Sequence, residues 1–136
     1  MARILIVEDQ PMLRYAAVAR FKDCGHEVTA CADYNETIAA LRAQRQPVDL
    51  LLTDWQYPGK ENGSKSGGLE LLRHLKIVAE INPEQLPKNV VVMSADPELA
   101  RVGVVLSGFE SPLPPVFLKD YLNRTLFQPV MEKLLP

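Results

Sequence analysis

Short apolar runs alternate with longer segments of mixed polarity along the chain. Each run is rich in Val, Ile, Leu or other strand-compatible residues, and each is followed by a polar or charged residue. Brief, nearly uninterrupted apolar runs of this kind indicate strands that are buried on both faces. The predicted strands are residues 3–7, 28–32, 50–53, 90–93 and 116–118.

The segments between these runs have the signals of helices. Pro11 suits the first turn of a helix, and Gly25 stands where a helix should end. Asp33-Tyr34-Asn35-Glu36 resembles a capping box with Asp in the N-cap position, and Asp96-Pro97 can begin a further helix. Apolar residues recur near helical spacing within 12–24, 38–41 and 69–78, then at Leu99, Val102 and Leu106, and finally at Leu122, Leu126, Val130 and Leu134.

Strands and helices in strict alternation predict five βα units. Such units build a parallel sheet with helices on both faces, joined by right-handed crossovers. The fold class is therefore α/β, and the 136 residues suit one domain covering 1–136.

Composition and charge narrow the functional classes. With 47% hydrophobic and 24% charged residues the chain has an ordinary globular composition, and its net charge of −2 argues against a nucleic-acid-binding or membrane-binding domain. No apolar stretch is long enough to span a bilayer, and the N-terminus does not resemble an export signal. We therefore expect a cytoplasmic protein in which Cys24 and Cys31 are free thiols.

Chemically active side chains follow four of the five predicted strands. Glu8 and Asp9 follow the first, Asp54 the third, Ser94 the fourth and Lys119 the fifth. Ligands of open parallel sheets bind at the carboxyl ends of the strands, so these groups should converge in one crevice. Three carboxylates against one ammonium leave two negative charges, which Mg²⁺ would balance. A lysine, a hydroxyl and Mg²⁺ together suit phosphoryl transfer to a carboxylate nucleophile.

The chain resembles the receiver domain of two-component response regulators, of the chemotaxis-regulator type. The resemblance rests on the strings ILIVEDQP, LLTDWQYP, GLELL, VVMSA and VFLK, which occur in this order. It implies a five-stranded, doubly wound, flavodoxin-like sheet with strand order 2-1-3-4-5. It also implies a phosphoacceptor switch that takes a phosphoryl group from a histidine kinase or a phosphotransfer protein and is not an enzyme.

The same resemblance implies a role for each matching site residue. Asp54 is the expected phosphoacceptor, and the expected Mg²⁺ ligands are Glu8, Asp9, Asp54 and the main-chain carbonyl of Gln56. Among the residues that act on the phosphoryl group, Ser94 supplies the switch hydroxyl and Lys119 pairs with a phosphoryl oxygen. Ala95 is the small residue beside Ser94 that leaves room for access.

Three positions near the site depart from the family pattern. Asp120 stands where the family usually has a proline after the lysine, so we expect a trans peptide bond there. Val116 replaces the usual aromatic residue, and alternation should turn the neighbouring Phe117 to the other face of the sheet. The segment from Gly59 to Gly67 is longer than usual and is either a tolerated surface insertion or an element that controls access to Asp54.

Other readings of the sequence stay open at this point. An aspartyl-nucleophile phosphatase is one alternative, although Gln56 stands where those enzymes usually carry a second aspartate. A degenerate receiver that only binds other proteins is another. Trp55 and Tyr57 could line the pocket or cover the end of the sheet, and His74 does not match the motif of a phosphohistidine protein. Pro129 should kink or split the last helix.

Overall fold

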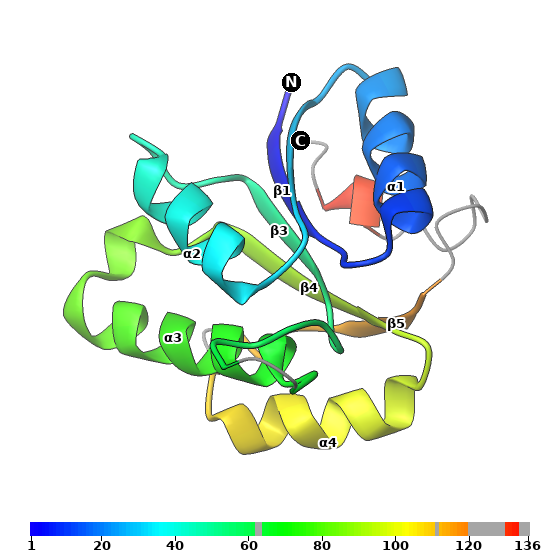
Figure 1. Cartoon of the computed structure of the whole chain (residues 1–136). Helices are drawn as coiled ribbons and strands as arrows, with labels where there is room; N and C mark the ends of the chain where they lie inside the picture. Colours follow the sequence, from blue (N-terminus) through cyan, green and yellow to red (C-terminus); the bar gives the residue numbers. More distant parts are fainter. Residues whose placement is uncertain (62–63, 111, 120–129, 134–136) are drawn as a thin grey trace.

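Five parallel strands form the centre of the molecule in the computed structural model (Figure 1). The structure describes residues 1–61, 64–110, 112–119 and 130–133. The sheet order is β2-β1-β3-β4-β5, which confirms the predicted topology. The strands are β1 (Arg3–Val7), β2 (Glu27–Cys31), β3 (Leu50–Asp54), β4 (Asn89–Ser94) and β5 (Val116–Leu118).

Helices cover both faces of this sheet. In Figure 1, α1 lies on one face, and α2, α3 and α4 lie on the other. Their bounds are α1 (Pro11–Asp23), α2 (Tyr34–Ala43), α3 (Gly67–Ile81) and α4 (Pro97–Ser107), with a short 3₁₀ turn, η1 (Pro83–Gln85), after α3. Within the described ranges, no helix is long and apolar enough to cross a membrane.

Alternating side chains of the strands divide the apolar core into two parts. Ile4 and Ile6 of β1 pack on the side of α1, whereas Leu5 and Val7 pack on the side of the other helices. Both pairs are buried, so positions 4–7 of the strand are all apolar. This two-sided burial explains why the strands appear in the sequence as continuous apolar runs.

Capping residues begin and end the helices where the sequence predicts. The Asp33 carboxylate accepts a hydrogen bond from the Glu36 main-chain N–H at 2.8 Å, and Asp96 accepts one from the Leu99 N–H at 3.2 Å. After α1 the backbone turns at Gly25 with φ of 85°, a left-handed conformation that suits glycine. The local signals therefore fix how the loops leave the strand ends.

Two expectations about the elements need correction. The second strand begins and ends one residue earlier than predicted, because its ladder pairs Arg3 with Glu27 and Val7 with Cys31. In α4 the predicted apolar positions Leu99, Val102 and Leu106 are exposed, and the helix contacts the core through other residues, Ala100 and Val104.

The last predicted helix lies largely outside the described residues, and so does the kink expected at Pro129. The described part is residues 130–133, where Val130 is buried in the core on the α1 side of the sheet. Asp120, with the peptide bond expected to be trans, also lies outside the described residues.

Candidate functional site

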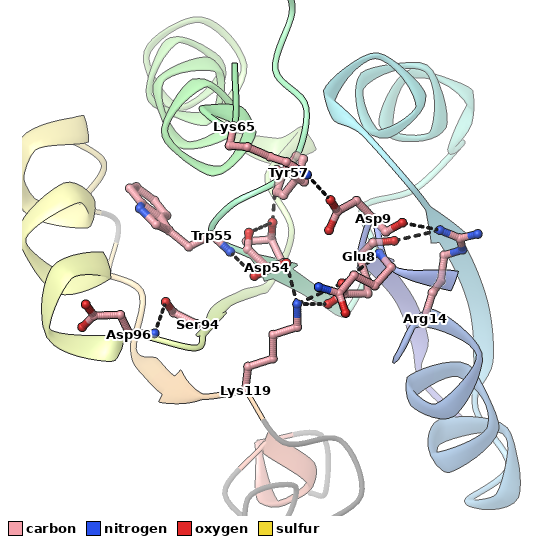
Figure 2. Close-up of polar contacts among 12 residues, drawn as sticks. Glu8, Asp9, Arg14, Asp54, Trp55, Tyr57, Lys65, Ser94, Asp96 and Lys119 are labelled. Atoms are coloured by element: carbon pink, nitrogen blue, oxygen red, sulfur yellow. Dashed lines mark hydrogen bonds and ion pairs between the residues drawn. The ribbon is translucent and has the colours of Figure 1, made fainter. Parts of the chain in front are cut away.

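The residues predicted from four strand ends meet at one edge of the sheet (Figure 2). They surround a cavity of about 230 Å³ at the carboxyl ends of the strands. Glu8 lies beneath it and is fully buried. The predicted residues that line the cavity are Asp9, Asp54, Gln56, Ser94, Ala95 and Lys119, and two unpredicted residues, Gln10 and Lys65, join them.

Lys119 ties the first and third strands together through its ammonium group. Its Nζ lies 2.8 Å from Asp54 Oδ2 and 2.8 Å from Glu8 Oε2, and its side chain is only 10% exposed. The Lys119 main-chain N–H donates to the Ser94 carbonyl at 2.8 Å. This bond extends the pairing of β5 with β4, so the sheet itself aims the lysine at the two carboxylates.

Acidic groups outnumber the cation at the centre of the site. One oxygen from each of Glu8, Asp9 and Asp54 lies within 4.8 Å of the others. Burial raises the pKa of Asp54 above its ordinary value, although the hydrogen bond from Lys119 opposes it. Burial likewise raises the pKa of Glu8, and the nearby charge of Asp54 adds to the effect. Burial thus disfavours the ionised form of both carboxylates, and three oxygen donors this close together fit a hard divalent cation.

The pKa of Lys119 reflects the same arrangement from the other side. Burial alone would lower the pKa of this ammonium, but its hydrogen bonds to Asp54 and Glu8 outweigh burial and raise it. Lys119 therefore stays charged at neutral pH. A permanent cation beside the Asp54 carboxylate is placed to attract an anionic group.

Main-chain groups orient the acidic side chains. Asp54 Oδ1 accepts a hydrogen bond from the Trp55 N–H at 2.8 Å, and Glu8 Oε1 accepts one from the Gln10 N–H at 3.1 Å. Arg14 of α1 donates to the main-chain carbonyl of Glu8 at 3.0 Å. These bonds orient the Asp54 carboxylate at the end of β3 and the Glu8 carboxylate in the loop after β1, and Lys119 joins the two.

Ser94 lies on the opposite wall of the cavity from Asp9. Its Oγ accepts a hydrogen bond from the Asp96 N–H at 3.0 Å, so the hydroxyl is held by its own loop. The two aromatic residues beside Asp54 do not line the cavity. Tyr57 is fully buried with its hydroxyl 3.1 Å from Thr53 Oγ1, and Trp55 packs so closely on Gly103 that a Cβ there would lie 2.2 Å from its ring. Both therefore cover the end of the sheet.

Of the two unpredicted residues at the cavity, Lys65 is the charged one. Its Nζ forms an ion pair with Asp9 Oδ2 at 2.6 Å across the mouth of the cavity (Figure 2). The sequence shows that its segment is unusually long, but nothing in the pattern shows which residue of that segment turns toward the site.

The prediction that Val116 and Phe117 of β5 face opposite sides of the sheet is confirmed, because Val116 packs in one half of the core and Phe117 against the other.

Comparison with known proteins identifies the family. The profile of the response regulator receiver domain matches residues 4–107, so the chain belongs to this family of two-component signalling domains. The two-component response regulator ARR11 of Arabidopsis thaliana is 28% identical over 135 residues, which are 98% of this chain but 23% of that protein. The chain thus spans about a quarter of the length of this curated relative. Receiver domains are generally signalling switches that bind Mg²⁺ at an acidic pocket.

Solved structures show the same fold. Chemotaxis response regulator CheY4 of Vibrio cholerae superposes with a TM-score of 0.73 at 19% identity, covering 98% of each chain. Response regulator protein TrrA of Thermotoga maritima, solved in complex with Mg(2+)-BeF, superposes with a TM-score of 0.66 at 18% identity, covering 98% of this chain and 96% of that one.

Proposed function

We propose that this chain is a phosphoacceptor switch in which Asp54 takes a phosphoryl group from a histidine kinase or a phosphotransfer protein. The observation that carries the proposal is the buried Asp54 carboxylate, held between Lys119 and the Trp55 N–H at a cavity that Asp9 also lines. A carboxylate nucleophile needs positioning and charge neutralisation more than acid–base groups to accept a phosphoryl group.

The cation site belongs to the same proposal. Glu8, Asp9, Asp54 and the Gln56 main-chain carbonyl would hold Mg²⁺, a set of oxygen donors that suits this ion. When bound, Mg²⁺ would supply positive charge to the oxygens of the transferred group. The Mg(2+)-BeF complex of the structural relative TrrA supports this assignment.

Transfer proceeds by attack of a carboxylate oxygen of Asp54 on phosphorus. An O–P bond forms while the N–P bond of a donor phosphohistidine breaks, and its electron pair stays on the imidazole nitrogen, which takes a proton from solvent. Lys119 Nζ, now on Asp54 Oδ2, would move its hydrogen bond to a phosphoryl oxygen. The Ser94 hydroxyl would leave the Asp96 N–H and donate to another of these oxygens.

The movement of Ser94 supplies the signal that partners detect. A ligand shifts a two-state equilibrium only through contacts that differ between the states. Val116 has a stiff, small side chain in place of a ring, so the response is carried by the loop after Ser94 and by the 59–67 segment. Hydrogen exchange should change in these loops when a phosphoryl mimic binds, with β5 nearly unaffected.

Hydrolysis of the acyl phosphate should be slow, so we place the protein outside the enzymes. The residues expected beside the path of an attacking water are Gln56 and Asp96, and the Asp96 carboxylate is engaged in capping α4. Neither is placed as a strong general base. We further propose that 1–136 is one receiver domain acting in the cytoplasm, with an output domain or a separate protein as its downstream partner.

Phosphorylation by a small donor tests this function. Incubation with acetyl phosphate and Mg²⁺ should add the mass of one phosphoryl group, and Asp54→Asn should abolish the gain. Asp49→Asn is the matched control, because it removes the same charge from the other end of β3 and should leave labelling intact. Labelling that survives in Asp54→Asn contradicts the assignment. No labelling of the folded wild type favours a degenerate receiver, and turnover at enzymatic rates favours a phosphatase.

A further inference from the structure

We propose that Lys65 is a built-in competitor of the divalent cation, occupying Asp9 until the cation displaces it. The proposal rests on the cation site proposed above. The 2.6 Å ion pair joins Lys65 Nζ to an oxygen of Asp9, one of the three carboxylates whose oxygens come together. If a metal cation binds this Asp9 oxygen while the Lys65 ammonium stays in place, the two positive charges repel each other.

The segment around Lys65 is anchored on both sides. The Glu70 carboxylate in the first turn of α3 accepts hydrogen bonds from the Lys60 N–H at 3.0 Å and from Ser66 Oγ at 3.1 Å. The Gly67 N–H donates to the Tyr57 carbonyl at 2.9 Å. These contacts hold the chain on either side of Lys65 against α3 and the end of β3, so the backbone presents the lysine to the cavity.

Close packing reinforces this placement. A Cβ on Gly59 would collide with the Glu70 carboxylate, and a Cβ on Gly67 would lie 2.2 Å from the Tyr57 ring. Glycine at these two positions lets the segment pass tightly over Tyr57 and Glu70. The described parts of the insertion, 59–61 and 64–67, therefore pack closely beside the site.

Exposure distinguishes the roles of the two lysines. Lys119 is 10% exposed and contacts two buried carboxylates, so it is a permanent part of the site. The Lys65 side chain is 62% exposed, and its partner Asp9 is 17% exposed. An ion pair open to water contributes little free energy, so a cation can break it. Lys65 thus lowers the affinity for the cation without blocking the site.

The charges of the site explain why the divalent cation should displace Lys65 from Asp9. Without Lys65, three carboxylates face one permanent ammonium, and the two remaining negative charges match one divalent cation. Lys65 supplies one positive charge at Asp9 when the cation is absent. When the cation binds, the lysine becomes surplus positive charge and should leave, which couples occupancy of the site to the contacts of the 64–66 segment.

Binding of Mn²⁺ alone measures this competition. Mn²⁺ accepts the same oxygen ligands as Mg²⁺, and the paramagnetic signal of the free ion reports how much is bound. We expect Lys65→Gln to bind Mn²⁺ about threefold to tenfold more tightly than the wild type, from loss of the pair and of the repulsion. Lys65→Arg keeps the charge and should stay close to the wild-type affinity.

Lys60→Gln is the matched control. Lys60 is an exposed lysine of the same segment, but it does not line the cavity, so its loss should change affinity by less than about twofold. Equal affinities of wild type and Lys65→Gln overturn the competition and leave the cation site standing. A similar gain in Lys60→Gln also overturns it, because the effect is then general charge. Absence of Mn²⁺ binding in both wild type and Lys65→Gln overturns the cation site itself.

Discussion

Strand β3 has an aspartate at each end, and the two are in opposite electrostatic situations. Asp49 precedes the strand, accepts a hydrogen bond from the Arg3 N–H at 2.8 Å and pairs with Lys88 at 3.1 Å. The bond from the Arg3 main chain is the main reason why the pKa of Asp49 is lowered. Asp54 ends the strand in a buried position, where loss of water raises its pKa despite Lys119.

The contrast separates a carboxylate that stabilises the fold from the one that we propose as the phosphoacceptor. Asp49 is partly exposed and has partners for its charge, so its ionised form favours the folded state. Asp54 lies buried beside Glu8 and Asp9, where burial raises its pKa and its ionised form therefore costs stability. Functional sites commonly carry such a cost, because the charge needed for chemistry is not the charge that best stabilises the fold.

Replacement of Lys119 should cause the largest loss of stability, at the Asp54 end of β3. Lys119→Met leaves Glu8 and Asp54 buried without their ammonium partner, so in EDTA we expect a loss of about 3 kcal/mol in the free energy of unfolding. Urea denaturation measures it. Mg²⁺ should restore part of the loss, because it binds the native state and supplies positive charge. An unchanged midpoint in EDTA would show that the carboxylates do not depend on Lys119.

Matched asparagine variants should change stability in opposite directions. In EDTA we expect Asp49→Asn to lose about 1 kcal/mol, because a charge-assisted hydrogen bond becomes a neutral one. We expect Asp54→Asn to gain about 1 kcal/mol, since it removes repulsion with Glu8 and leaves Lys119 paired with Glu8. Urea midpoints of the two variants, taken in the same buffer, decide the matter. A loss of equal size in both would erase the distinction between the two ends.

The stability of wild type relative to each asparagine variant should also depend on pH in a different way. The pKa of Asp54 is raised, so wild type becomes more stable relative to Asp54→Asn as pH falls through that raised pKa toward 3.8, and the variant's advantage vanishes. The pKa of Asp49 is lowered, so its contribution is present above 3.8 and is lost only as pH falls through the lower folded value. Unfolding curves in EDTA at a series of pH values test both signs. If the two stability differences between wild type and variant change over the same pH range, the expectation is contradicted.

The smallest effect is expected at the surface pair of Asp49. The Lys88 side chain is 67% exposed, so Lys88→Ala should cost no more than about 0.5 kcal/mol and less at high salt. Asp49 keeps its hydrogen bond from Arg3, which is the larger cause of its lowered pKa. A cost as large as that of Asp49→Asn would mean that the ion pair, and not the main-chain bond, carries the stabilisation.

The fold could be predicted from local signals because they agree with the tertiary structure. Residues 50–52 are apolar at every position because both faces of β3 are buried, and Asp33 caps α2 through its own side chain. In helix α4 the prediction was wrong, because Ala100 and Val104 make its core contacts while Leu99, Val102 and Leu106 face water. Periodicity detects an apolar face but does not tell whether that face meets the core.

The site could be predicted where the topology dictates it. Parallel strands must bring Glu8, Asp54, Ser94 and Lys119 to one edge, so their meeting follows from their place after each strand. The contact of Lys65 with Asp9 depends on the path of an irregular segment anchored by Glu70. No periodic pattern in the sequence predicts the path of an irregular segment. The sequence therefore identified the long segment but could not show that its Lys65 contacts Asp9.

Chemical mapping of the acceptor tests the central claim most directly. Wild-type protein labelled with acetyl phosphate and Mg²⁺ is treated with borohydride, which reduces an aspartyl phosphate to homoserine, and peptides are then sequenced by mass spectrometry. The account predicts conversion of Asp54 and no change at Asp49, although both lie at the ends of one strand. Conversion at Asp9, Asp49 or another carboxylate, with Asp54 intact, would contradict it.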